Sequence, residues 1–271
     1  MIAEEKLIEE FLNEIFLKYG YDFREYSTAS ITRRIKRFKE LRSGKNWIEF
    51  QDQVLTDEKY FGEFLREVTV NVTEMFRDPS FYKALREQVI PQLKTYPFIR
   101  IWDAGCSTGE ETYSLAILLY EEGLYDKCQI YATDINQQVV KKAKEGVFTL
   151  QQIKEFTSNY HASGGKEEFS NYFTAKYNNV VMHDFLKKNM VFSAHNLVSD
   201  GSFNEFHLII CRNVLIYFKR ELQDRVIKLF YESLPAFGFL GLGNKETLSV
   251  SDYRNKFIEI DKIEKIYKRS G

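Results

Sequence analysis

The stretch FIRIWDAGCSTGEETYSLAILLYEEG, residues 98–123, decides the fold class of this chain. It opens with a short apolar run that is partly β-branched, as expected of a buried strand, and continues through a turn that contains glycine. The run that follows the turn, TYSLAILLYEEG, has the composition of a helix that ends at Gly123. A strand, a turn and a helix in this order predict one unit of an α/β domain.

Similar units recur along the chain. QIYATDI and FHLIICRN have the pattern of strands, and each is followed by a helical stretch, NQQVVKKAKEG in the first case and RELQDRVIKLFYESL in the second. This alternation predicts an α/β fold in which a mostly parallel sheet is covered on both faces. Ligands of such sheets bind outside the carboxyl ends of the strands.

Two other regions depart from the alternation. Apolar residues between Glu5 and Arg66 recur at helical spacing, with a stop at Gly20 and new helices expected near Ser30 and Trp47. We therefore expect a helical domain over residues 1–70 and an α/β domain over residues 71–271. Between residues 146 and 189 the alternation lapses, which indicates an insertion, and the segment 161–166 is expected to be a mobile loop.

Composition excludes several classes of function. The chain has 38 basic and 39 acidic residues and a net charge of -1, so the whole molecule has no attraction for nucleic acid or an anionic membrane. No apolar run approaches the length of a membrane span, and the N-terminus lacks the pattern of a secretory signal. The three cysteines, Cys106, Cys128 and Cys211, read as reduced thiols. We expect a cytoplasmic protein that neither inserts into a membrane nor binds nucleic acid.

The loop DAGCSTGEE, residues 103–111, is the strongest candidate for a binding site. Gly105 and Gly109 permit a sharp turn and a close approach of the backbone. A dinucleotide-binding loop would carry G-x-G-x-x-G, and this loop has one glycine fewer and two carboxylates instead, which disfavours a nicotinamide oxidoreductase. Carboxylates at the start of a helix suit a ligand with a cationic amino group and hydroxyls, such as an adenosylated amino acid.

Three further sets of polar residues accompany this loop. Asp134 ends the next strand, about 20 residues on, where such folds place an acid for ribose hydroxyls; alternatively, it only caps the following helix. In VNVTEMFRDP, Asn71 and Thr73 alternate before Arg77, and Asp78 with Pro79 reads as a helix start. Arg212 and Asn213 follow a buried strand at the ligand edge of the sheet.

Together, TEMFRD, DAGCSTGEE, ATDIN, the pair NL at 196–197 and CRNVLIYF resemble the CheR family of chemotaxis receptor glutamate O-methyltransferases in order and spacing. The resemblance covers essentially the whole chain. It implies a Rossmann-like S-adenosylmethionine-dependent methyltransferase sheet, an N-terminal all-helical domain and a small β-subdomain inserted over residues 148–192. It also implies methyl transfer to glutamate carboxylates, with S-adenosylhomocysteine as the product and no metal.

The resemblance further assigns roles to individual residues. It implies cofactor contacts from Asn71, Thr73, Arg77, Glu111, Asp134, Asn196, Leu197, Asn213 and Val214, and it implies Tyr217 at the reaction centre. A glutamate side chain has a pKa of about 4.3, so this nucleophile is ionised at neutral pH and needs no general base. The enzyme must supply alignment, and we expect catalytic roles for Arg77, which can orient a carboxylate, and Tyr217.

The basic stretch ITRRIKRFKELR is the candidate for docking a substrate protein. Arg33, Arg34 and Arg37 lie on one expected helix, either as a solvated face or as a surface that meets the glutamate-rich helices of a methyl-accepting receptor, as the resemblance implies. In some members of the family the β-subdomain also captures the C-terminal peptide of a receptor as an added strand.

The chain departs from the family at residues 243–246, where GNKE replaces a glycine-His-Ser-Glu type segment. This departure keeps open a regulator that binds S-adenosylmethionine without turnover. A methyltransferase for nucleic acid or a small molecule would share Asp134 and the loop at residues 103–111, called the cofactor loop below. It should, however, carry a base pocket such as an Asn-Pro-Pro-Tyr set, and no such set follows a strand here.

Overall fold

Two compact units make up the structure, and each is described by itself. The computed structural model describes residues 2–42, 46–69, 73–249 and 251–271. The first unit comprises Met1–Asn71 with Tyr217–Val226, and the second comprises Val72–Ile216 with Ile227–Gly271. The sequence predicted a division after residue 70; the later segment Tyr217–Val226 also clusters with the first unit, which sequence periodicity did not indicate.

Four helices form the N-terminal part of the first unit, where the sequence predicted three. They are α1 (Ile2–Tyr19), α2 (Thr28–Arg42), α3 (Trp47–Thr56) and α4 (Glu58–Val68). The additional break lies at Asp57, whose carboxylate accepts hydrogen bonds from the N–H groups of Lys59 and Tyr60 at 2.9 and 3.1 Å. This capping starts a new helix directly after α3, which the continuous apolar pattern did not reveal.

Aromatic rings fill the core of the first unit. Phe11 from α1, Phe38 from α2, Phe50 from α3 and Phe64 from α4 are all buried. The ring centroids of Phe11 and Phe38 each lie 5.7 Å from that of Phe64, in edge-to-face geometry. Such pairs bury large apolar surfaces in a favourable orientation, so one phenylalanine from each helix holds the four together.

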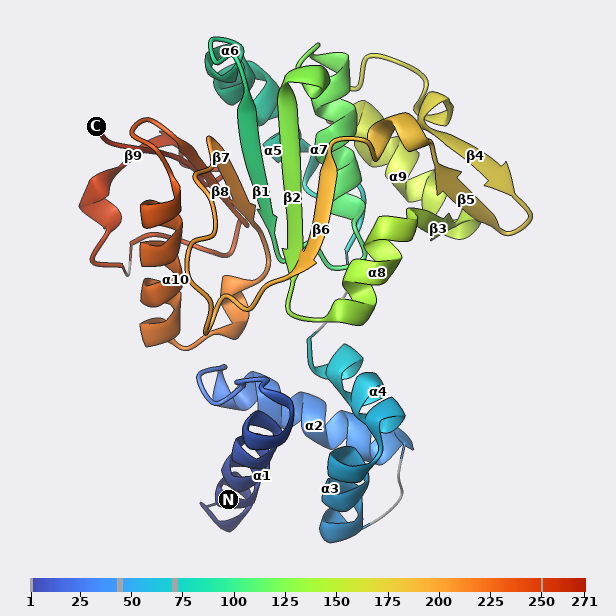
Figure 1. Ribbon diagram of the computed structural model, residues 1–271, viewed down its shortest axis with the longest axis vertical. Helices are drawn as coiled ribbons and strands as arrows, with labels where there is room; N and C mark the ends of the chain where they lie inside the picture. Colours follow the sequence, from blue (N-terminus) through green and yellow to red (C-terminus); the bar gives the residue numbers. More distant parts are fainter. Residues whose placement is uncertain (1, 43–45, 70–72, 250) are drawn as a thin grey trace. The chain divides into compact units, whose positions relative to one another are not determined.

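A seven-stranded sheet organises the second unit, in the order β6-β2-β1-β7-β8-β10-β9 (Figure 1). The pairs from β6 to β8 are parallel, and β10 is antiparallel to both β8 and β9. The predicted mostly parallel sheet is therefore confirmed. The strands are β1 (Ile99–Ala104), β2 (Cys128–Asp134), β6 (Met190–Ala194), β7 (Leu208–Cys211), β8 (Phe239–Leu242), β9 (Phe257–Asp261) and β10 (Ile266–Arg269).

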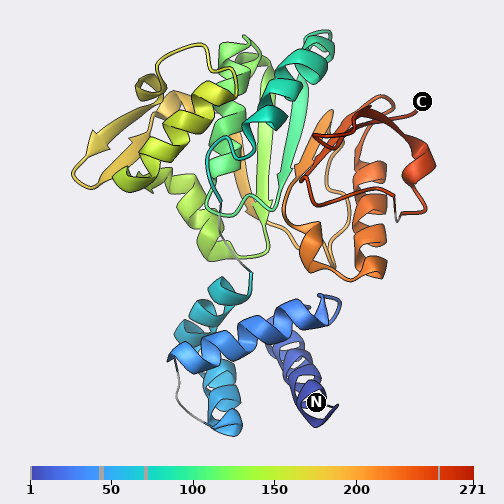
Figure 2. The same ribbon diagram turned by 180° about the vertical axis from the view of Figure 1, so that it is seen from behind.

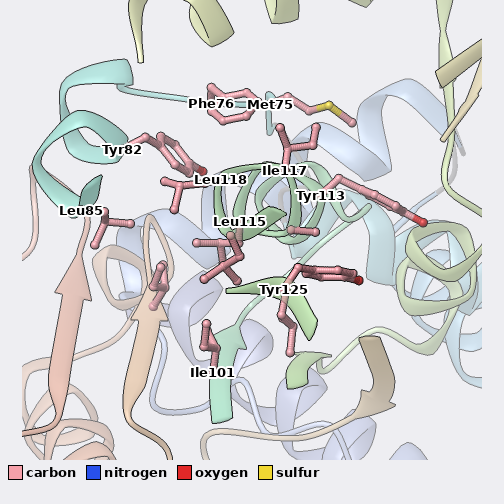
Figure 3. Close-up of a cluster of buried hydrophobic side chains, with 14 of the residues drawn as sticks. Met75, Phe76, Tyr82, Leu85, Ile101, Tyr113, Leu115, Ile117, Leu118 and Tyr125 are labelled. Carbon is pink, nitrogen blue, oxygen red and sulfur yellow. The ribbon is translucent and has the colours of Figure 1, made fainter. Parts of the chain in front are cut away.

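The central strand β1 packs on both faces because its side chains alternate. Ile101 joins Leu115 and other apolar residues in the cluster around α7, which Figure 3 shows in close-up. Trp102 points the other way, and its ring lies 5.1 Å from Phe206 and 5.4 Å from Phe230. The α-helices of the second unit are α5 (Pro79–Ala84), α6 (Ile90–Leu93), α7 (Glu110–Glu121), α8 (Gln137–Glu145) and α9 (Leu150–Ala162). Helix α10 (Arg220–Ser233) begins in the first unit and ends in the second.

A separate three-stranded antiparallel sheet occupies most of the predicted insertion, in the order β3-β5-β4 (Figure 2). Its strands are β3 (Val147–Thr149), β4 (Phe173–Lys176) and β5 (Asn179–Met182). Residues 190–192, expected in the insertion, belong instead to β6 of the large sheet, where Met190 pairs in parallel with Ile130. The prediction was wrong at this boundary because a short edge strand gives a weak sequence signal.

The segment that the sequence predicted to be mobile, residues 161–166, is tied to α7. Glu121 accepts hydrogen bonds from the Lys166 N–H at 3.1 Å and from the Tyr172 hydroxyl at 2.8 Å. Its second oxygen pairs with Arg86 at 2.5 Å, and the Glu121 side chain is almost fully buried. A polar sequence indicated a loop but did not show that a buried carboxylate anchors it.

Candidate functional site

The loop after β1 approaches two neighbouring segments closely, and glycine makes this possible. Gly105 and Gly109 have φ angles of 98° and 97°. A Cβ atom at Gly105 would lie 2.4 Å from a methyl group of Val214, and one at Gly109 would lie 3.0 Å from the Ala143 backbone. The predicted need for glycine is confirmed, and the close neighbours in the structure are the segment after β7 and helix α8.

Asp134 ends β2 and joins two loops. Its two carboxylate oxygens accept hydrogen bonds from the N–H of Ser107 at 3.0 Å and from the N–H of Asn136 at 2.9 Å. The cap of α8 is Asn136, whose side chain accepts from the N–H of Gln138. The alternative that Asp134 only caps this helix is therefore wrong. Each Asp134 oxygen retains acceptor capacity for a ligand hydroxyl.

The segment from Thr73 to Asp78 is held over α7 and α9 by its main chain. The N–H of Phe76 donates to the Ser114 hydroxyl at 2.8 Å, and the carbonyl of Met75 accepts from the Asn159 amide at 3.2 Å. Phe76 and Asp78 flank Arg77 with φ angles of 52° and 54°, in the left-handed region. Thr73 and Arg77 are half-buried, and Asn71 lies outside the described residues.

Arg212 links this segment to the cofactor loop. Its guanidinium donates to the Glu111 carboxylate at 2.7 Å, the Asp78 carboxylate at 2.6 Å and the Arg77 carbonyl at 3.0 Å. The expected helix start is confirmed in that Asp78 precedes α5 and Pro79 is its first residue. The Asp78 side chain, however, makes no capping bond and pairs with Arg212 instead.

A buried carboxylate shapes the turn after β7. Glu246 accepts hydrogen bonds from the N–H groups of Gly243, Asn213 and Val214 at 2.7, 3.1 and 2.9 Å, and from that of Ile216 at 3.4 Å. Asn213 has a φ angle of 60°. The turn that carries Asn213 and Val214 is thus built around one side chain from the segment after β8.

The pair Asn196 and Leu197 follows β6, beside the end of β2. The N–H of His195 donates to the Asp134 carbonyl at 3.1 Å, and the side chain of Asn196 accepts from the N–H of Val198 at 2.9 Å. Leu197 is half-buried. The His195 ring packs edge-to-face on that of Trp102, with the ring centroids 5.1 Å apart.

Carboxyl groups concentrate around the cofactor loop, and burial raises their pKa values. Burial and the nearby Glu111 raise the pKa of Asp103 well above its usual range, and burial raises the pKa of Asp134 against the opposing backbone hydrogen bonds. Burial also raises the pKa of Glu110 to about 7. A cationic ligand would favour the ionised forms of these carboxyl groups, so the site fits a ligand that carries a sulfonium or an ammonium group.

The first unit holds the residues expected on the substrate side. Arg33 and Arg37 are exposed, and Arg37 lies 3.2 Å from Glu67 in an ion pair. Arg34 is buried and donates to the Val68 carbonyl at 2.7 Å. The expectation that Arg34 docks substrate is therefore wrong for this structure, because the guanidinium completes the hydrogen bonding of a buried carbonyl.

Tyr217 also belongs to the first unit, and the N-terminal residues hold it. Its carbonyl accepts from the N–H of Ser27 at 2.8 Å, and the neighbouring Phe218 forms a β-bridge with Tyr26. The Arg34 guanidinium lies over the Tyr217 ring, 4.2 Å from its centroid. The buried arginine therefore contacts the tyrosine for which the family resemblance implies a place at the reaction centre.

The second unit brings most of the candidate cofactor residues to one edge of the sheet. Asp134 ends β2, and Glu111, Asn196 and Asn213 follow β1, β6 and β7 in the chain. The sequence did not predict that Arg212 and Glu246 bond to the candidate cofactor segments, as they do to Glu111 and to Asn213 respectively. The polar pair after the strand LIIC signalled Arg212 only as a surface of the ligand edge, and nothing in the spacing connected Glu246 with residue 213.

Comparison with known proteins identifies the family of the chain. Residues 71–264 match the model of the CheR methyltransferase SAM binding domain, and residues 6–69 match that of the CheR methyltransferase all-alpha domain. The chain belongs to the CheR methyltransferase family. Its fold is that of an S-adenosylmethionine-dependent methyltransferase preceded by an all-helical domain, and its cofactor is S-adenosylmethionine.

Individual CheR relatives cover nearly the whole chain. A putative methyltransferase Cher3 of Pseudomonas putida is 46% identical over 96% of this chain and 95% of its own length. A chemotaxis protein methyltransferase of Listeria monocytogenes is 32% identical over 86% of this chain and 87% of its own length. Among solved structures, the N-methyltransferase NodS of Bradyrhizobium japonicum has a TM-score of 0.42 at 11% identity, covering 88% of this chain and 99% of NodS.

Two further observations concern a metal site and helices that could cross a membrane. Among the residues that the structure describes, no group of three or more His, Cys, Asp or Glu side chains is arranged to hold a metal ion. None of the helices in the described ranges has both the length and the apolar composition that crossing a membrane requires.

Proposed function

We propose that this CheR protein transfers a methyl group from S-adenosylmethionine to glutamate side chains of a chemoreceptor-like protein, giving glutamate methyl esters. The relative from Listeria monocytogenes is named a chemotaxis protein methyltransferase, and its similarity extends over most of both chains. The proposal assigns cofactor contacts to Asn71, Thr73, Arg77, Glu111, Asp134, Asn196, Leu197, Asn213 and Val214.

The observation that carries the proposal is the bonding of Arg212. One guanidinium binds both Glu111, at the start of α7, and the carbonyl of Arg77. The main chain of Arg77 is therefore fixed beside the cofactor loop, and its half-buried side chain extends from a backbone that is held in place. A guanidinium in such a place is suited to orient a carboxylate with paired hydrogen bonds.

The reaction places modest chemical demands on the protein. A receptor glutamate carboxylate attacks the methyl carbon, a C–O bond forms as the C–S bond breaks, and the sulfur keeps the electron pair. The cofactor supplies an activated methyl group, and the protein supplies alignment, which is worth roughly 7–11 kcal/mol in favourable cases. We assign this alignment to Arg77 and Tyr217.

Two surfaces are proposed for the receptor. Arg33 and Arg37 are exposed on α2, and we propose that they meet glutamate-rich receptor helices. The exposed ion pair of Arg37 with Glu67 is weak enough to be exchanged for a receptor carboxylate. Strand β4 is an edge of the small sheet, and we propose it as the place where a receptor C-terminal peptide adds as a strand.

A methyl-transfer assay tests the proposal directly. Purified protein, labelled S-adenosylmethionine and receptor fragments that contain glutamate-rich helices should give label that base treatment releases as methanol. Fragments in which the candidate glutamates are replaced by alanine should accept none. Transfer of label to other residues, or to neither fragment, would contradict glutamate methylation.

The same assay separates an enzyme from a regulator that binds the cofactor without turnover. The departure at residues 243–246 is the feature that kept a regulator open as an alternative. Its two unusual residues, Asn244 and Lys245, are exposed, whereas Gly243 and Glu246 are buried and hydrogen-bonded to each other. The departure therefore leaves the buried part of this segment unchanged, and turnover is the expected result.

A further inference from the structure

Glu246 is a buried carboxylate whose hydrogen bonds all serve the main chain. It is 3% exposed. One oxygen accepts from the N–H groups of Gly243 and Asn213 at 2.7 and 3.1 Å, and the other accepts from those of Val214 and Ile216 at 2.9 and 3.4 Å. Burying a carboxylate costs much free energy unless such bonds compensate it. Four main-chain donors on one side chain therefore indicate that this carboxylate organises the chain around it.

The segment that Glu246 organises is the turn between β7, which ends at Cys211, and the short 3-10 turn that begins at Leu215. Asn213 adopts a left-handed conformation there, with a φ angle of 60°. A residue other than glycine in this region is strained, and the surroundings must hold it in place. The hydrogen bonds from Asn213 and Val214 to Glu246 provide this restraint.

Gly243 is the partner that lets Glu246 reach the turn. A Cβ atom at residue 243 would lie 2.8 Å from a carboxylate oxygen of Glu246 and 2.9 Å from the nitrogen of Asn213. A side chain of any size would separate the two. Asn244 and Lys245, between the pair, are exposed. The segment after β8 thus has two buried residues that shape the turn and two exposed residues between them.

We infer that Glu246 is a positioning residue for the cofactor, which acts by fixing the turn that presents Asn213 and Val214. This inference rests on the proposed cofactor contacts of those two residues. Glu246 is not itself a catalytic residue, because its carboxylate is occupied by main-chain donors. Its effect should appear in cofactor affinity and in the rigidity of residues 213–216.

The test is Glu246→Gln in the full-length protein. The variant has the same shape, but one side-chain oxygen is replaced by an amide nitrogen that faces two N–H donors. About two of the four hydrogen bonds are lost, and the dissociation constant for S-adenosylhomocysteine should rise at least about tenfold in calorimetry. The KM for S-adenosylmethionine should rise more than kcat falls. In the ligand-free protein, amide exchange at residues 213–216 should become faster.

Glu121→Gln is the matched control. Glu121 is an equally buried carboxylate of the same unit, but it bonds the Lys166 N–H and Arg86, away from the turn. This variant should lower the melting temperature and leave the dissociation constant and the exchange at residues 213–216 unchanged. Equal weakening of cofactor binding by both variants would show a general loss of stability and would overturn the inference.

The remaining outcomes separate the inference from the proposed function. Wild-type protein that binds no S-adenosylhomocysteine would overturn the proposed function. If wild type binds S-adenosylhomocysteine and Glu246→Gln has a dissociation constant within about twofold of that of wild type, the positioning role alone would be overturned. If Glu246→Gln does not fold, Gly243→Ala gives the same test, because its methyl group displaces the carboxylate from the turn without removing its charge.

Discussion

Arg212 shows how one buried charge organises several binding segments at once. Its guanidinium joins Glu111 of the cofactor loop to Asp78 and to the main chain of Arg77. Removing one member of a buried ion pair typically costs about 3–5 kcal/mol, because the other charge is left uncompensated. Substitutions at Arg212, Asp78 or Glu111 would therefore lower stability as well as activity, and the two effects could not be separated. The side chain of Arg77 can be changed without breaking these bonds.

Arg77→Ala should remove most turnover while the fold survives. The loss of two charge-assisted hydrogen bonds to the substrate carboxylate corresponds to about 3 kcal/mol, or a fall in kcat of roughly 100-fold. Steady-state kinetics at saturating cofactor measures the effect, and circular dichroism confirms folding. Arg77→Lys keeps the charge but loses the paired geometry, so its kcat should lie between those of wild type and Arg77→Ala. A kcat like that of wild type in Arg77→Ala would exclude this residue from the mechanism.

Asp134→Ala should weaken the binding of S-adenosylhomocysteine. Hydrogen bonds from ribose hydroxyls to a carboxylate are worth about 1.5–3 kcal/mol, so the dissociation constant should rise roughly 10- to 150-fold in calorimetry. Asp126→Ala is the control, because that carboxylate is 83% exposed and pairs with Lys188 at the surface. Equal affinities for Asp134→Ala and wild type would refute the ribose assignment.

Glu110 should make stability depend on pH. Burial raises the pKa of Glu110 in the folded protein to about 7, from 4.5. The folded state then binds more protons than the unfolded state between these values, so this group lowers stability as pH rises from about 4.5 to about 7. The free energy of unfolding of Glu110→Gln, measured with urea and compared with that of wild type, should therefore increase by up to about 3 kcal/mol between pH 4 and pH 8. A difference that stays constant with pH would contradict the shifted pKa.

Helix α2 separates two kinds of arginine within one turn. Arg33 and Arg37 are exposed, whereas Arg34 is buried against the Val68 carbonyl and the Tyr217 ring. The charge of the basic run does not by itself show which side chain turns inward, because all three residues are arginines. The helix period decides it, together with the apolar residues Ile31, Ile35 and Phe38 that share the buried face.

Substitutions at two neighbouring arginines of α2 should affect different properties, stability for Arg34 and receptor binding for Arg33. Arg34→Met keeps the aliphatic packing but leaves the buried Val68 carbonyl without this donor, at a cost of about 1–3 kcal/mol in urea unfolding. Arg33→Ala should change stability by less than about 0.5 kcal/mol and should weaken binding to a receptor fragment. The docking assignment fails if Arg33→Ala binds the fragment as wild type does, and the structural role of Arg34 fails if Arg34→Met is as stable as wild type.

For the molecule as a whole, charge is distributed unevenly although the sum is close to zero. The net charge is -1, yet α2 carries the basic run that includes Arg33 and Arg37. Affinity for a glutamate-rich receptor helix should therefore fall steeply between about 50 and 500 mM salt, because exposed charges are screened within a few ångströms at high ionic strength. Titrations at several salt concentrations measure this slope, and an affinity independent of salt would contradict docking by charge.

S-adenosylhomocysteine binding provides the internal comparison for that experiment. Apart from Asn71, the proposed cofactor contacts lie in the second unit and depend on buried groups such as Asp134, which salt screens much less than exposed ones. The dissociation constant for S-adenosylhomocysteine should therefore change little over the same range. A parallel loss of both affinities would indicate a general effect of salt on the protein.

The sequence by itself determined the α/β class, the helical N-terminal region and the glycine loop after β1. These features follow from short-range patterns: apolar periodicity, glycine where the backbone turns sharply, and polar residues at strand ends. The sequence predicted neither the break at Asp57 nor the start of β6 at Met190, because capping and edge pairing leave weak local signals.

Only the tertiary structure decided which polar residues hold the site together. Arg212 reaches Asp78 and Glu111 across more than a hundred residues of chain, and Glu246 reaches Asn213 from the next strand of the sheet. The structure also turned Arg34 inward and made Asn136, rather than Asp134, the helix cap. The contacts of Arg212 and Glu246 join segments distant in sequence, and the geometry that selects them exists only once the sheet has formed.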